Sequence, residues 1–111
     1  MPVQVLVTAE PFGVLVAAHG VPDAAAIAQA AEDAAALSPE AGRLVVDLRE
    51  AALVPAGPVL GLVGALRLRN PGVPIALVCD RLSGRRLLRS RCRHLHVAVM
   101  DALPPSLAAY G

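Results

Sequence analysis

Aromatic residues are scarce in this chain of 111 residues, and lysine is missing from it altogether. Phe12 and Tyr110 are the only aromatic residues. Because proteins that bind single-stranded nucleic acid stack its bases on aromatic side chains, the composition argues against that class. All ten basic residues are arginine, and the formal net charge is only +1. So small a charge gives no overall attraction to nucleic acid or to an acidic membrane, and we expect neither as a partner.

Cysteine is also scarce, and long apolar runs are absent. Cys79 and Cys92 stand alone, without a Cys-x-x-Cys motif, which is typical of two reduced thiols in or near a core. Residues 1–5 lack the positive charge and the apolar stretch of a signal peptide. Charged residues and prolines interrupt every apolar run before it reaches the ~18–20 residues that cross a bilayer. We therefore expect a cytoplasmic protein without a membrane span.

The chain is instead rich in residues that form a core. Hydrophobic residues make up 56% of it and charged residues 17%, which argues against disorder. A chain of 111 residues has the size of a single domain, with no room for a second core. We expect one domain that covers residues 1–111.

Short apolar runs alternate with helical patterns along the chain. The patterns predict strands at 3–8, 14–18, 43–48, 73–79 and 97–99, and helices at 24–37, 57–69, 82–95 and, as a short turn, 105–109. A turn rich in proline and glycine joins the first two strands as a hairpin. Asp23 precedes the first helix as its N-cap. This order predicts an α/β fold with a mixed, mostly parallel sheet of about five strands and about four helices.

The helix expected at residues 57–69 is apolar on almost every side rather than along one stripe. In a small domain, such a helix is either buried on two sides or leaves one side free for a partner, and we favour the second interpretation. Its glycines at positions 57, 61 and 64 belong to no phosphate-binding motif, and we interpret them as close-packing positions.

Four short segments occur in an order that is known from one protein family. They are GVPD at 20–23, LVVDL at 44–48, VPAGP at 54–58 and LSGRRLL at 82–88. In that family, Gly-Glu-Leu-Asp opens the first helix, a strand ends in Asp-Leu, and a turn with Asp-Ser-Ser-Gly leads into the second helix. Over essentially its whole length, the chain resembles this family, the STAS domains of bacterial anti-sigma factor antagonists.

The resemblance implies a regulatory domain without enzymatic activity, whose partner is an anti-sigma factor or serine kinase. Occupying that kinase would free a sigma factor and so regulate transcription indirectly. By the same resemblance, the docking residues are Asp23, Pro55, Ala56, Gly57 and Pro58.

One departure from the family pattern concerns its phosphorylation switch. Pro55 stands where the family has aspartate, and Ala56 stands where it has the serine that the kinase phosphorylates. Alanine has no hydroxyl, and no serine or threonine lies between residues 40 and 81. We therefore expect no phosphoacceptor, and a protein that stays in its binding-competent form. The alternative is a divergent scaffold, sensory or ligand-binding module of the same fold, outside sigma-factor control, and self-association into a homodimer remains open.

Histidine and cysteine could bind a metal ion or act in catalysis, but these residues lack the neighbouring ligands or motifs that either role requires. His94 and His96 have no third and fourth ligand at zinc spacing, so no metal is expected. Neither cysteine has a motif that orients it toward a histidine, and we expect no catalytic residue and no cofactor. We interpret Asp47 as a strand-end residue that ties down the following turn.

Arginines gather on one side of the helix expected at 82–95. They are Arg81, Arg85, Arg86, Arg89 and Arg93. A solvated surface is the preferred interpretation, since surface helices commonly carry charge. An acidic partner surface or a phosphate-bearing ligand is the alternative.

Overall fold

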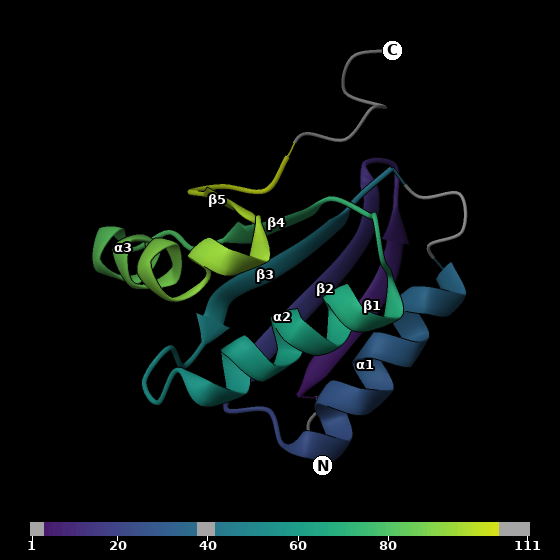
Figure 1. The fold of residues 1–111 in the computed structure, drawn as a ribbon, viewed down its shortest axis with the longest axis horizontal. Helices are drawn as coiled ribbons and strands as arrows, with labels where there is room; N and C mark the ends of the chain where they lie inside the picture. The colour runs from purple at the N-terminus through teal and green to yellow at the C-terminus, as the bar shows by residue number, and fades with distance from the viewer. Residues whose placement is uncertain (1–3, 38–41, 105–111) are drawn as a thin grey trace.

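The computed structural model describes residues 4–37 and 42–104, which form the α/β fold drawn in Figure 1. The elements in chain order are β1 (Val5–Glu10), β2 (Gly13–Gly20), α1 (Ala24–Leu37), β3 (Leu44–Ala51), α2 (Gly57–Arg69), β4 (Ile75–Val78), α3 (Leu82–Arg91), a 3-10 helix η1 (Arg93–Leu95) and β5 (Ala98–Met100). The described residues hold three α-helices rather than about four. The helical turn expected at 105–109 lies outside the described residues.

The five strands form one sheet in the order β1-β2-β3-β4-β5. β1 and β2 pair antiparallel, and every later pair is parallel, which confirms the mixed, mostly parallel sheet. The hairpin between β1 and β2 requires glycine at position 13. Gly13 has a φ of 137°, and a Cβ atom there would collide with the carbonyl of Arg43. That carbonyl accepts a hydrogen bond of 3.0 Å from the Val14 amide, so the chain passes too close for a side chain.

The third helix is shorter than its sequence pattern predicts. α3 ends at Arg91, and residues 93–95 form the separate turn η1. His96 follows in the left-handed conformation, with a φ of 51°, and turns the chain toward β5. The prediction of one helix through residue 95 was therefore wrong, because the return to the sheet has to begin before that point.

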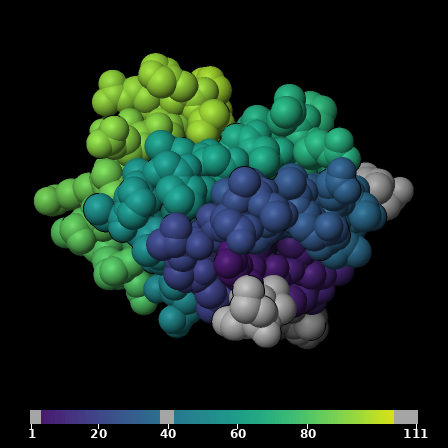
Figure 2. Space-filling model, turned by 90° about the horizontal axis from the view of Figure 1, so that it is seen from below, coloured from purple at the N-terminus to yellow at the C-terminus, as the bar shows by residue number. Residues whose placement is uncertain are grey.

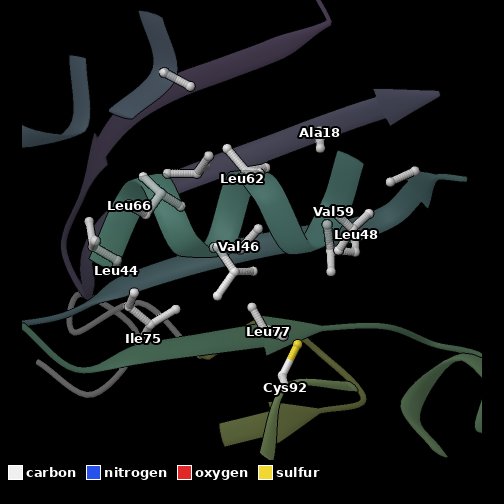
Figure 3. Close-up of a cluster of buried hydrophobic side chains, with 14 of the residues drawn as sticks. Ala18, Leu44, Val46, Leu48, Val59, Leu62, Leu66, Ile75, Leu77 and Cys92 are labelled. Carbon is white, nitrogen blue, oxygen red and sulfur yellow. The ribbon is translucent and has the colours of Figure 1, made fainter. Parts of the chain in front are cut away.

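The core lies between the sheet and its helices. Figure 1 shows α1 and α2 side by side in front of the sheet, with α3 beside β4 and β5. In Figure 3, side chains of α2 lie against those of β3, with Leu77 of β4 and Cys92 close by. Leu44, Val46 and Leu48 belong to this cluster, whereas Val45 points to the opposite face because side chains alternate along a strand.

Helix α2 buries one side and exposes the other. Its fully buried side chains are Val59, Leu62, Val63 and Leu66. Leu68, on the outer side, is 80% exposed. Arg67 holds the helix in place, since its guanidinium donates to the carbonyl oxygens of Val73 at 2.9 Å and Leu95 at 2.8 Å. One side of α2 is therefore free, and its contact with a partner stays a prediction.

The interpretation of the α2 glycines as close-packing positions was wrong. A Cβ atom at Gly57 or Gly64 would have no heavy atom within 4 Å, and at Gly61 it would make only an ordinary contact with Ile27, at 3.7 Å. Gly84, at the start of α3, is the close-packed position instead. A Cβ atom there would lie 2.5 Å from the Cys79 sulfur and 2.7 Å from the Leu53 Cδ1.

A matched pair of substitutions tests this assignment. We expect Gly64→Ala to raise the free energy of unfolding by about 0.5–1 kcal/mol, because alanine is the better helix former and the site is open. Gly84→Ala is expected to lower it by about 1–3 kcal/mol through overpacking. Urea unfolding of the two variants measures both effects, and equal changes would contradict the packing described.

Candidate partner-docking surface

Two loops meet at the end of the molecule to which the parallel strands point. The loop after β2 and the loop after β3 lie together, since neighbouring parallel strands end at the same edge of a sheet. The Ala52 amide donates a hydrogen bond of 2.8 Å to the carbonyl of Gly20 and joins the two loops. Figure 2 views this end, where the residues that follow β2, drawn in indigo, lie against teal residues that lead into α2. We call residues 20–23, 52–58 and 81–83 the strand-end surface.

Asp23 begins α1, as the sequence predicts. Its Oδ1 accepts a hydrogen bond of 2.8 Å from the Ala26 amide, which satisfies one of the free amides of the first helical turn. The Asp23 amide donates in turn to the side-chain oxygen of Gln4, also at 2.8 Å. The exposed carboxylate of Asp23 thus caps the start of α1, and its contact with a partner stays a prediction.

The turn at 54–58 places Ala56 directly before the first residue of α2. The Val54–Pro55 peptide is cis, and Pro55 and Gly57 are exposed. Pro58 lies in the first turn of the helix, and no side chain caps this helix end. Free amide hydrogens therefore give the start of α2 a partial positive charge at the surface. A phosphorylated residue at position 56 would sit on that charge, but Ala56 has no oxygen to carry a phosphate.

The strand-end surface is rimmed by exposed apolar side chains. Val54 is 81% exposed, Leu82 is 52% exposed and Val21 is 51% exposed. A groove of about 410 Å³ runs between the loop after β3 and the start of α3, with Leu53 and Leu87 among its lining residues. Exposed apolar groups beside a polar, uncapped helix end are typical of a surface that binds another protein.

Asp47 lies within β3 and not at the turn that follows it, which corrects the sequence interpretation. Its Oδ2 accepts from the Arg49 guanidinium at 2.8 Å, and its Oδ1 accepts from the Arg49 amide at 3.1 Å. Burial raises the pKa of Asp47, but the hydrogen bonds and charge of Arg49, together with His19, outweigh it. The pKa of the carboxyl therefore lies below its ordinary value of 3.8.

This lowered pKa predicts how stability depends on pH. A carboxyl whose pKa is lower in the folded state stabilises the fold above its ordinary pKa of 3.8, and that contribution is lost as the pH falls through the folded value. We expect Asp47→Asn to cost about 1–2 kcal/mol at pH 7, because it weakens charged hydrogen bonds. The difference in the free energy of unfolding between this variant and the wild type should become smaller as the pH falls below 3.8. Urea unfolding at several pH values measures this difference, and Asp101→Asn, at an exposed position, is the control. A difference in the free energy of unfolding that stays constant across pH would contradict the prediction.

The described residues contain no group of three or more histidine, cysteine or acidic side chains able to hold a metal ion. His94 and His96 are exposed, and both cysteines are buried and free. Burial raises the pKa of the Cys92 thiol, which disfavours the reactive thiolate. Among residues 4–37 and 42–104, no helix is long and apolar enough to cross a membrane.

Comparison with known proteins found no family model, no curated protein and no solved structure that matches this chain. The positions of the loops at 20–23 and 54–58 could be predicted from the sequence, whereas the groove beside α3 could not, because no local motif marks a space between two distant segments.

Proposed function

We propose that the chain is a regulatory protein-binding domain of the STAS type that occupies an anti-sigma factor or serine kinase through the strand-end surface. The observation that carries the proposal is the exposed, uncapped start of α2 with Ala56 directly before it. In the family that the sequence resembles, a phosphate on the residue at this place ends the interaction with the kinase. A phosphate adds ~1.5–2 negative charges, and position 56 cannot receive it here. The protein then stays permanently able to bind.

Two further features support a docking role for this surface. Val21 and Val54 are exposed apolar side chains of the strand-end surface, and removing them from water on binding would favour a complex. The loops that carry them are joined by the hydrogen bond between Ala52 and Gly20, so the surface is ordered before a partner arrives. Such preorganisation lowers the entropic cost of binding.

Affinity capture from the native host lysate, with the purified chain as bait, tests the proposal. We expect mass spectrometry to recover an anti-sigma factor with an ATPase-type kinase domain. Recovery of this chain alone, or of unrelated proteins, would contradict the role in sigma-factor control.

A ligand-binding module of the same fold is the second candidate, and the groove of about 410 Å³ favours it. Leu53 and Leu87 offer apolar contacts there, and Arg81 offers a positive charge. Native mass spectrometry of the purified protein distinguishes the candidates. A bound small molecule that Leu87→Trp removes would support this second function, whereas a mass equal to that of the bare chain would favour the first.

A further inference from the structure

The charges of this near-neutral chain are distributed unevenly along it. Residues 1–50 carry seven carboxylates and two arginines, whereas residues 51–111 carry eight arginines and two carboxylates. Most of these arginines lie in or next to α3 and η1: Arg81, Arg85, Arg86, Arg89, Arg91 and Arg93. Within the described part of the chain, the salt bridges join Asp47 to Arg49 and Glu32 to Arg69. No described carboxylate therefore forms a salt bridge with the arginines around α3.

Positive charge at the start of α3 is unfavourable for the helix, whereas Arg89 and Arg91 in its last turn are favourable. The first turn of α3 holds no acidic residue, although the start of a helix favours negative charge. Arg81 and Arg85 place positive charge there instead. Arg86 and Arg89 are exposed and extend the same side of the helix, since residues three and four apart are neighbours on a helix surface. A dense positive surface that extends to the unfavourable start of its helix is better explained by an acidic partner than by solvation alone.

A groove of about 450 Å³ runs along this side of α3, between the helix and β5. Arg85 and Arg89 line it together with Leu82, Val99 and Met100. Arg85 donates to the carbonyl of Cys79 at 3.0 Å, and Arg89 to the carbonyl of Val99 at 3.5 Å. These bonds hold the two guanidinium groups at the groove and leave further N–H groups for a carboxylate, which a guanidinium can bind through two hydrogen bonds.

The other wall of the groove is β5, which is an edge strand of the sheet in the part of the chain that the structure describes. β5 is the last strand, and β4 is its one neighbour among the described residues. The Met100 carbonyl points to β4, because it accepts from the Cys79 amide at 3.0 Å. Backbone groups alternate in direction along a parallel strand, so those of Val99 point away from the sheet. An unpaired edge of this kind can pair with an added strand.

We propose that this groove binds an acidic segment of a partner protein, which pairs in extended form with the edge of β5 and sets alternate carboxylates against Arg85 and Arg89. An amide of the segment would replace the long Arg89 contact to the Val99 carbonyl and free that guanidinium for a carboxylate. The period of two in a strand sends every second side chain to the helix side. A nucleic acid has no backbone amides that could pair with the edge of β5, which favours a peptide as the occupant.

This groove shares Leu82 with the rim of the strand-end surface used in the proposed function, but its arginines lie outside that surface. Leu82, Arg85 and Arg89 line the groove next to β5, whereas Ser83, Gly84 and Leu87 line the one next to the loop after β3. At about 100° per residue, these two sets lie on different sides of α3. The proposed peptide site can therefore be tested independently of any sigma-factor partner.

Fluorescence anisotropy with a labelled peptide of about ten alternating glutamate and valine residues tests the proposal on the full chain. We expect saturable binding, and the double substitution Arg85→Gln with Arg89→Gln should raise Kd at least about tenfold. Arg91→Gln removes an exposed arginine of α3 that does not line the groove, and it should change Kd less than about twofold. Circular dichroism confirms that each variant is folded. No binding by the wild type, or equal effects of the double and control variants, would overturn the proposal.

Two further probes separate strand pairing from simple charge attraction. The same peptide with alternate backbone amides methylated cannot donate to the β5 edge, and we expect its Kd to rise at least about tenfold. Unchanged affinity of the methylated peptide would overturn strand pairing. A DNA duplex of equal charge that binds as tightly as the acidic peptide would overturn the peptide as occupant and assign the surface to nucleic acid.

Discussion

Ala56→Glu is expected to raise the Kd of the complex with an anti-sigma kinase by about ten- to a hundredfold, while the fold keeps its stability. The added carboxylate would lie two residues from the exposed apolar side chain of Val54, where docking would strip it of water without a matching charge. The same carboxylate lies at the positive end of α2, which favours the helix. Loss of affinity without loss of stability would therefore report on the interface itself. Isothermal titration and thermal unfolding measure the two quantities.

A control variant shows whether the loss of affinity depends on the position of the added carboxylate or only on its charge. Ala28→Glu adds the same charge to an exposed position of α1, away from the strand-end surface. Its Kd should stay within about twofold of the wild type. If both variants weaken binding equally, the added net charge and not its position explains the loss of affinity. Unchanged affinity of Ala56→Glu would place the interface elsewhere.

Leu62→Ala is expected to lower the free energy of unfolding by about 2–5 kcal/mol. The Leu62 side chain is fully buried among core side chains of β2 and β3 (Figure 3), so its truncation leaves a cavity that the surroundings fill only in part. In a domain whose whole stability is about 5–15 kcal/mol, this loss is large. Urea unfolding followed by circular dichroism measures it.

Leu68→Ala is the matched control on the same helix. Leu68 is 80% exposed, and its truncation should change stability by less than about 0.5 kcal/mol. Similar losses for Leu62→Ala and Leu68→Ala would mean that both sides of α2 are buried, which would contradict the free outer side described above.

The helices at 24–37 and 57–69 could be predicted to the residue, because their signals are local. Asp23 caps the first helix and Pro58 opens the second, and each acts on its own neighbours in the chain. The mixed sheet could be predicted from the alternation of strands and helices. Local signals were thus sufficient for the order of the elements and for the loops of the strand-end surface.

Features that depend on distant segments could not be predicted in this way. The end of α3 at Arg91 depends on where the chain returns to the sheet, and the packing of Gly84 depends on Cys79 and Leu53. Both grooves lie between α3 and segments far from it in sequence. The arginine side of α3 was visible in the sequence, but its relation to the free edge of β5 requires the fold.

Amide hydrogen exchange on the complex with the captured kinase tests the docking claim most directly. The amides of Gly57 and Val59 lie in the uncapped first turn of α2 and should exchange quickly in the free protein. We predict strong slowing of exchange at these amides and in residues 20–23 when the partner binds, with little change along α1. Slowing confined to α1 or to the edge of β5, with none at the start of α2, would contradict it.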